Sequence, residues 1–358
     1  MMNYREITLR EAIHFKNGKK RPTSEGNIPV YGGNGVLGYA GESNYEHCII
    51  IGRVGACCGS VYLEEGKCWV SDNAIAAVPS GDNDTKFFYY LLKGLHLNER
   101  HIGISQPLLT QEILNKINCE VPSYPDQQRI AELLSSLDRK INVNRKLNDN
   151  LADLLQTIYQ ERFSNDILAV NQGVLSDICS YSRDKVAVSE LNVSTYFSTE
   201  NMLSGKAGST EATSLPTTSQ TTACHKGDTL ISNIRPYFKK IVYCEGNCGC
   251  STDVLCFTPS QPRYSTYLFS TLYADKFFAF MVAGSKGTKM PRGDKQQIMT
   301  YPVVLPSEEE LARFNTIASP LLEQIYSNRA ENKRLSILRD TLLPKLMSGE
   351  IDVSAVQL

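Results

Sequence analysis

The sequence of 358 residues lacks several features that would assign it at once to a class of protein. Lys+Arg is 37 against Asp+Glu at 38, which excludes a uniformly basic nucleic-acid coat but allows local basic loops. Residues 1–10 carry three charges and no apolar core, so a secretory signal is not expected. No window reaches the roughly 20 apolar residues that a membrane span needs. We therefore expect a cytoplasmic chain with no membrane contact, whose 11 cysteines are free thiols.

Motifs that carry chemistry are also missing. The chain has no G-x-x-x-x-G-K-[ST] sequence and no Asn-Pro or Asp-Pro dipeptide, which argues against a P-loop motor and an amino-methyltransferase loop. A G-x-G-x-x-G sequence starts at Gly33, but no helical pattern follows it, so we interpret it as a turn-rich loop. Glu65-Gly-Lys67 resembles half of a nuclease metal site, yet residues 1–71 contain no Asp. We expect a hairpin turn there and no catalytic residue in the chain.

A cysteine group in the second half resembles part of a zinc site. Cys244, Cys248, Cys250 and Cys256 have the wrong spacing for paired C-x2-C knuckles, and no histidine lies nearby. If these residues form strands, alternation would place the thiols on both faces of a sheet. We predict no metal site.

The most informative pattern is internal repetition. Three ungapped blocks match in the same order: Ile49–Ser80 with Thr229–Ser260 at a shift of 180 residues, and Gly103–Ser123 with Gly287–Ser307 and Gln127–Phe163 with Leu311–Met347 at a shift of 184. Each copy predicts a mixed α/β domain followed by a long helix. The predicted fold class is thus α+β, with two mixed α/β domains joined by two long helices that form an antiparallel coiled coil, and with an internal pseudo-two-fold repeat.

The helical segments show apolar residues in the 4-3 spacing of a heptad seam. In the first helix the seam residues are Ile130, Leu134, Leu137, Ile141, Asn144, Asn148, Leu151, Leu155 and Ile158, and in the second they are Phe314, Ala318, Leu321, Ile325, Asn328, Asn332, Leu335 and Leu342. If the helices overlap fully, Asn144 faces Asn328. The asparagines either set the register of the pair or contact a partner protein. Pro320 is a possible kink about two turns into the second helix.

Basic residues cluster at three places, in glycine-containing segments suited to phosphate contact and base readout. The predicted DNA-binding residues are Lys16, Lys19, Lys20, Arg21, Asn34, Arg53, Arg235, Tyr237, Lys239, Lys240, Lys286, Lys289 and Arg292.

Several segments resemble one known family. PSYPDQQRIAELLSSLDRKINVNRKL is similar to the conserved helical region of specificity subunits of type I restriction–modification systems, and IPVYGGNGVLGYAGES, DTLISNIRPYFKK and GTKMPRGD are similar to parts of their recognition domains. The resemblance implies target-recognition domain 1 at 1–124, spacer helix 1 at 125–163, target-recognition domain 2 at 164–307, spacer helix 2 at 308–348 and a tail at 349–358.

The resemblance also implies a function. Members are non-catalytic subunits that read a bipartite, asymmetric site on double-stranded DNA with a fixed gap between its halves. They recruit two modification subunits, which bind S-adenosylmethionine and methylate adenine, and motor-nuclease restriction subunits join them. The chain itself would then hold no cofactor. The second helix lacks the Gln-Gln-Arg-Ile run of the first, which puts equal docking of both partners in question. The alternative is a coiled-coil scaffold with two docking domains and no DNA binding.

Overall fold

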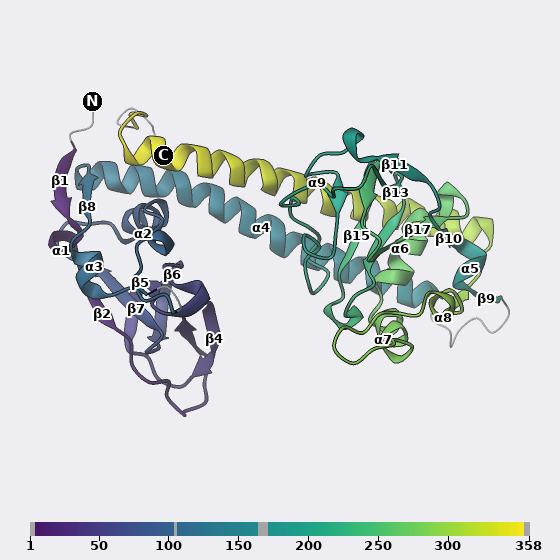
Figure 1. The fold of residues 1–358 in the computed structure, drawn as a ribbon, viewed down its shortest axis with the longest axis horizontal. Helices are drawn as coiled ribbons and strands as arrows, with labels where there is room; N and C mark the ends of the chain where they lie inside the picture. The colour runs from purple at the N-terminus through teal and green to yellow at the C-terminus, as the bar shows by residue number, and fades with distance from the viewer. Residues whose placement is uncertain (1–3, 104–105, 164–170, 354–358) are drawn as a thin grey trace. The chain divides into compact units, whose positions relative to one another are not determined.

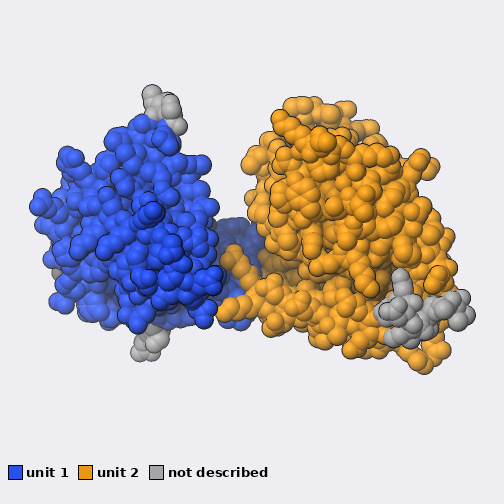
Figure 2. All heavy atoms as spheres, turned by 90° about the horizontal axis from the view of Figure 1, so that it is seen from below, with its two compact units in different colours: residues 1–143, 331–358 blue, residues 144–330 orange. Residues whose placement is uncertain are grey.

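The computed structural model describes residues 4–103, 106–163 and 171–353. The chain divides into two compact units, drawn in different colours in Figure 2. Unit 1 consists of residues 1–143 and 331–358, and unit 2 consists of residues 144–330. Two 40-residue helices, α4 (Tyr124–Phe163) and α9 (Glu308–Met347), each contribute one part to either unit (Figure 1). Among the described residues, no helix combines the length and apolar character required to cross a bilayer.

Unit 1 is built around a six-stranded sheet with the order β2-β7-β5-β6-β3-β4. Its strands are β2 (Ile13–Asn17), β3 (Ile28–Gly32), β4 (Gly35–Ala40), β5 (Tyr45–Gly52), β6 (Val61–Val70) and β7 (Ala74–Pro79). A second sheet pairs β1 (Arg5–Thr8) with β8 (Asn118–Val121). The shorter helices are α1 (Leu9–Ala12), α2 (Thr85–Gly94) and α3 (Gln111–Asn115), with 3-10 turns η1 (Gly55–Cys57) and η2 (Leu97–Glu99).

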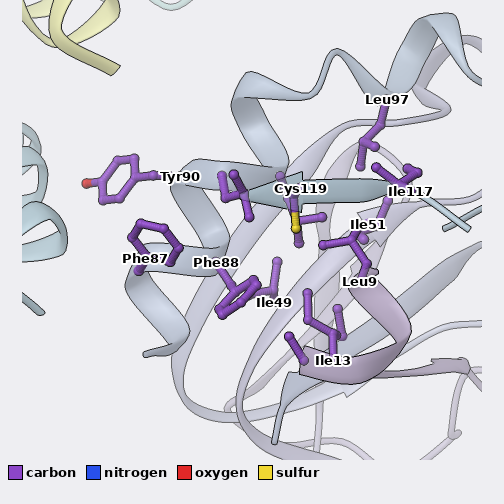
Figure 3. Packing of buried hydrophobic residues seen from close by; sticks show 14 of the residues in the cluster. Leu9, Ile13, Ile49, Ile51, Phe87, Phe88, Tyr90, Leu97, Ile117 and Cys119 are labelled. Atoms are coloured by element: carbon purple, nitrogen blue, oxygen red, sulfur yellow. The ribbon is translucent and has the colours of Figure 1, made fainter. Parts of the chain in front are cut away.

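The core of unit 1 joins this sheet to the long helices. Asp84 caps α2 by accepting a hydrogen bond from the Phe87 amide at 2.8 Å, which starts the helix and directs Phe87 and Phe88 inward. Both phenylalanines pack edge to face at 5.4 Å beside the β5 residue Ile49 (Figure 3). Ile130 of α4 is fully buried in the same cluster, so the start of the long helix is fixed to the sheet by apolar burial.

Unit 2 contains three sheets, with the orders β10-β17-β14-β15, β11-β13-β16-β12 and β18-β9. Its strands are β9 (Gln172–Val174), β10 (Cys179–Tyr181), β11 (Lys185–Ala187), β12 (Tyr196–Phe197), β13 (Gln220–Cys224), β14 (Thr229–Ser232), β15 (Ile241–Tyr243), β16 (Cys248–Cys250), β17 (Val254–Pro259) and β18 (Pro302–Val304). The shorter helices are α5 (Leu175–Ile178), α6 (Ser265–Tyr273), α7 (Asp275–Ala283) and α8 (Lys295–Met299), with 3-10 turns η3 (Val188–Glu190), η4 (Pro236–Phe238) and η5 (Pro262–Tyr264).

An aromatic cluster joins α4, α6 and α9 in unit 2. Phe163 lies 4.9 Å from Tyr267 and 5.3 Å from Phe314, measured between ring centroids, with near-perpendicular planes. Such edge-to-face pairs add to the apolar burial of the three rings. The Tyr267 hydroxyl donates to the Val304 carbonyl at 2.6 Å, so its polar end is satisfied inside the core.

The internal repeat is confirmed by strand register. Ile49 of β5 pairs with Ala77 of β7, and the residues 180 positions later, Thr229 and Phe257, pair in β14 and β17. The order β2-β7-β5-β6 in unit 1 corresponds to β10-β17-β14-β15 in unit 2. These findings confirm the predicted α+β class with two mixed domains and long paired helices.

In unit 1, α4 and α9 run antiparallel. The Asn332 side chain donates to the Ile141 carbonyl at 3.3 Å, while further along α9 Arg339 contacts Asp138, which lies earlier on α4. The Arg339–Asp138 pair has a separation of 2.6 Å and is about four-fifths buried at the arginine side chain. A partly buried pair of this kind adds orientation to the apolar seam.

Unit 2 shows the same antiparallel direction with a register that corrects the prediction. Asn328 Nδ2 donates to Asn148 Oδ1 at 2.8 Å, whereas full overlap would place Asn328 opposite Asn144. The partner is therefore one helical turn further along α4. The heptad spacing is equally compatible with either register, and the side chains packed at each end of the helices decide between them.

Three further expectations need correction or comment. Glu65–Lys67 is not a hairpin turn, because β6 continues through it and Lys67 pairs with Glu46. The irregularity lies on β5, where His47 has a left-handed φ of 51°. Helix α9 continues through Pro320 without a break in its assignment.

The cysteine expectation is wrong in one respect. Alternation does not scatter the thiols of unit 2, because Cys224, Cys244, Cys248, Cys250 and Cys256 are all buried in one small cluster with Leu230 and Val242. The strands of two sheets meet there, so residues of different strands contribute to one interior. All eleven cysteines are free, and the described part of the chain holds no group of His, Cys, Asp and Glu suited to a metal ion.

Candidate nucleic-acid interface

Each unit presents a pair of loops joined by backbone hydrogen bonds. In unit 1 the loop after β5 meets residues 102–109, since the Gly55 amide donates to the Pro107 carbonyl at 3.0 Å. In unit 2 the loop after β14 meets residues 284–293, since the Arg235 amide donates to the Pro291 carbonyl at 2.8 Å. Gly55 and Arg235 are 180 residues apart and the prolines 184 apart, so the two sequence shifts meet in one structural feature.

The equivalence extends across both loop pairs. Val54 bridges Leu108 in unit 1 as Ile234 bridges Arg292 in unit 2, and the closing bridges Ile102–Leu108 and Lys286–Arg292 correspond as well. The structure therefore brings the basic run at 235–240 together with the basic run at 286–292, which the sequence had shown only as separate clusters. We call these two runs the unit 2 loop pair, residues 233–240 and 284–293.

The first loop of this pair is held in a strained conformation. Arg235 and Lys239 both have left-handed φ values of 51° on either side of η4. Non-glycine residues pay roughly 1–2 kcal/mol in this region, so the surrounding contacts must fix it. The Lys240 ammonium donates to the Thr199 carbonyl at 2.5 Å, and the Lys206 amide donates to the Lys239 carbonyl at 2.9 Å. Lys240 thus anchors the loop.

Acidic residues organise the remaining cations. Asp275, at the start of α7, contacts Lys206 at 2.6 Å and Lys239 at 3.0 Å. The hydrogen bonds from these two ammonium groups lower the pKa of Asp275 below its usual value. Lys286 contacts Asp294 at 2.5 Å, and this bond together with the Gln297 and Gln296 amides lowers the pKa of Asp294. Exposed pairs of this type are weak and exchange readily with a phosphate.

Arg292 and Lys289 complete the basic surface of unit 2. The Arg292 guanidinium contacts Asp253 at 2.9 Å and stays about half exposed. Lys289 is exposed, and the neighbouring Met290 is 49% exposed. The Arg235 Nε and the Asn233 Oδ1 are buried without a hydrogen-bond partner. Buried polar atoms left in this state are costly, which fits loops that complete their bonding with a ligand.

The unit 1 residues surround the edge of the six-stranded sheet. Lys16 lies on β2, and the Lys19 amide donates to the Val70 carbonyl at 3.0 Å. Lys20 follows as an exposed residue, and the Arg21 guanidinium lies against Gly38 of β4. These four cations form one run along the sheet.

Asn34 and Arg53 lie on a different group of loops in unit 1. Asn34 occupies the β3–β4 turn, and the Ser60 hydroxyl donates to the Gly33 carbonyl, which ties this turn to the loop after β5. That loop begins at Arg53, whose amide donates to the Asn73 carbonyl at 3.0 Å. The structure thus brings Asn34 and Arg53 toward one loop cluster.

Sequence reasoning missed several exposed residues. Phe238, directly after Tyr237, is 39% exposed, and Met290 lies on the second loop of the pair. The long helices also carry exposed apolar residues outside the seam, namely Val143, Leu147, Leu154, Ile317, Ile337 and Leu338. Apolar positions that do not fit the heptad spacing were the available signal. Of the seam residues, Leu137, Leu151, Leu321 and Leu335 are half-buried, and Ile130, Leu134, Ile141, Asn144, Phe314, Ile325 and Asn328 are buried.

Comparison with known proteins gives the same result for sequence and fold. The profile of the type I restriction modification DNA specificity domain matches residues 2–152. The chain is 31% identical over 116 residues to the specificity subunit of the Escherichia coli type I restriction enzyme EcoprrI, covering 32% of this chain and 29% of that protein. It is 23% identical to the MjaIX specificity subunit of Methanocaldococcus jannaschii, covering 77% of this chain and 71% of the relative.

A solved structure matches nearly the whole fold. The specificity subunit from M. genitalium has a TM-score of 0.67 at 19% sequence identity, covering 97% of this chain and 96% of that one. The architecture is therefore that of a duplicated α+β protein with two long helices. The chain belongs to the family of specificity subunits of type I restriction–modification systems.

Proposed function

We propose that this chain is the non-catalytic DNA-reading subunit of a type I restriction–modification complex, acting in the cytoplasm. Unit 1 and unit 2 each read one half of an asymmetric, bipartite site on double-stranded DNA. The observation that carries the proposal is the equivalent loop pair in each unit. Homologous loops with different side chains suit the reading of two different half-sites, because each base pair offers its own pattern in the major groove.

In this proposal the residues divide by task. Lys16, Lys19, Lys20, Arg21, Lys286 and Lys289 contact phosphates, which gives affinity and salt dependence. Asn34, Arg53, Arg235, Tyr237 and Arg292 supply direct readout, since Asn and Arg side chains match adenine and guanine edges. Lys239 and Lys240 mainly hold the loop in position, because both are engaged by protein oxygens.

The long helices serve two further tasks. The seam of α4 and α9 sets the unread gap, and exposed apolar side chains on the same helices dock two modification subunits. In unit 1, Val143 and Ile337 are 58% and 57% exposed, and in unit 2 Leu154 is 47% exposed. Apolar residues in such positions indicate protein contacts. Adenine methylation with S-adenosylmethionine would then belong to the modification subunits, and restriction to the motor-nuclease subunits. The domain division 1–124, 125–163, 164–307, 308–348 and 349–358 remains part of this proposal.

Salt-dependent DNA binding tests the proposal. The triple variant Lys286→Ala, Lys289→Ala, Arg292→Ala removes three candidate contacts, so the slope of log affinity against log salt should fall by about 0.9 per lost phosphate contact. The control is Arg313→Ala, which removes one exposed cation that pairs with Glu309 on α9. An unchanged affinity and slope in the triple variant, or no DNA binding by the assembled complex, would favour the scaffold alternative.

A further inference from the structure

The unit 2 loop pair carries more than charge. Tyr237 is 50% exposed and Phe238 39% exposed at the end of η4, with ring centroids 4.8 Å apart. Met290, on the second loop of the pair, is 49% exposed. None of these three side chains belongs to a hydrophobic cluster of the described residues. Three large apolar side chains thus lie on two bonded loops where burial is not available to them.

The backbone holds this apolar tip rigidly. Arg235 and Lys239 flank it with left-handed φ values, and the Arg235 amide is bound to Pro291 on the second loop. On the other side, the Gly205 amide donates to the Phe238 carbonyl at 2.8 Å. Strain that is fixed by contacts on both sides is common at sites that bind a ligand. The aromatic pair is therefore presented in advance of binding, which reduces the ordering cost.

The surroundings of the tip select the partner. Arg235, Lys239, Lys286, Lys289 and Arg292 lie on the same two loops. Three acidic residues, Asp253, Asp275 and Asp294, pair with members of this group, so the loops and their counter-ions keep an excess of positive charge. An apolar tip surrounded by cations fits a polyanion with apolar surfaces inside, which is the chemistry of duplex DNA with its stacked bases.

We infer that Tyr237, Phe238 and Met290 form a wedge that enters the groove of DNA and unstacks one base step of the half-site read by unit 2. This inference rests on the proposed function and adds a mode of recognition to it. Apolar wedges in other proteins open a base step and kink the duplex, at a cost of a few kcal/mol that extra contacts offset. Pyrimidine–purine steps open most easily, so the wedge selects a flexible step at its position.

Unit 1 lacks this device. The residues 180 positions earlier are Cys57 and Cys58, and Cys58 is 5% exposed. The equivalent backbone bond from Gly55 to Pro107 is present, so the loop has the same frame without aromatic side chains. The two half-sites should consequently differ, with one unstacked step in the half read by unit 2 and no equivalent wedge in the half read by unit 1.

The test uses the full chain assembled with its modification subunits and duplexes that carry the methylated site. 2-Aminopurine is placed at successive positions of both half-sites, and its fluorescence rises where stacking is lost. We expect one enhanced step in the unit 2 half-site apart from the adenine that the methyltransferase acts on. Tyr237→Ala with Phe238→Ala should abolish that signal and weaken binding about tenfold, the loss expected for one aromatic stacking contact.

Matched variants define the outcomes. Tyr237→Phe keeps the apolar volume and should retain the signal, and Cys57→Ala in unit 1 should change nothing. Specific DNA binding with no enhanced step in the unmodified protein would overturn the wedge while leaving the proposed function intact. This scan does not depend on the stability of any variant. No specific DNA binding at all would overturn both. Binding of the tip to anionic lipid vesicles, lost in the double alanine variant, would assign these residues to a membrane instead.

Discussion

Replacing Asn328 by leucine should weaken the helix pair of unit 2, because the substitution leaves a buried oxygen without its donor. Asn328 and Asn148 are 5% and 8% exposed, and the bond between them is 2.8 Å long. Gln324 also donates to Asn328 Oδ1 at 2.8 Å. Unpaired buried polar groups cost roughly 1–3 kcal/mol, partly offset by leucine burial, so we expect a net loss of about 1–2 kcal/mol.

Replacing both asparagines by leucine should reverse the loss. The double variant has no orphaned group in the seam and gains apolar contact, so the helix pair should be at least as stable as in the unmodified chain. The same double variant no longer specifies the register, since an asparagine pair inside a seam penalises every alignment that separates its members.

Hydrogen exchange of peptides from residues 144–155 and 322–333 measures these effects locally. A loss of 1–2 kcal/mol corresponds to exchange about 5 to 30 times faster. Asn150→Leu is the matched control, because Asn150 lies on the exposed face of α4 and its replacement should leave exchange unchanged. Equal protection in Asn328→Leu and the unmodified chain, or additive losses in the double variant, would refute this reasoning.

Three further predictions concern charge, docking and the core. Asp275→Asn frees Lys206 and Lys239, so DNA binding should tighten several-fold and its salt slope should steepen by about 0.9, as seen by titration at several salt concentrations. The pKa of Asp275 is lowered in the folded chain, so its stabilising effect is present above the usual value of 3.8 and is lost as pH falls below it. Melting temperature against pH should therefore flatten there in Asp275→Asn, and an unchanged profile would contradict the ion pairs. Leu154→Asp should remove one of two modification subunits from the assembled complex, and light scattering that still gives two copies would exclude this docking face. Phe87→Ala should lower the free energy of unfolding by about 3–5 kcal/mol in urea titrations, because the ring is fully buried, whereas a loss under 1 kcal/mol would mean that the core repacks around it.

The repeat and the helices were predictable from sequence for clear reasons. Shifts of 180 and 184 residues align segments that adopt the same register, because insertions between the copies fall in loops while the strands and helices keep their lengths. The seam was predictable because apolar spacing reports the buried face of a helix directly. Register was not, since Asn328 meets Asn148 instead of Asn144 through packing that heptad spacing does not encode.

Loops and clusters were harder to predict. Glu65–Lys67 has turn chemistry, yet pairing with β5 keeps it in a strand. The cysteines of unit 2 meet because two sheets share one interior, a tertiary arrangement invisible to strand alternation. In the basic runs, charge alone did not separate Lys240, which binds the Thr199 carbonyl, from Lys289, which is exposed. That distinction depends on where the backbone folds back.

Mapping methylated adenines in cells that carry this chain and its modification subunits tests the central proposal most directly. Our account predicts one asymmetric site with two specified halves and a constant gap. Insertion of one heptad between Asn144 and Leu151, together with its counterpart between Asn328 and Leu335, should lengthen the gap and leave both halves unchanged. Methylation at a single continuous site, or a gap that stays the same after the insertion, would contradict the account.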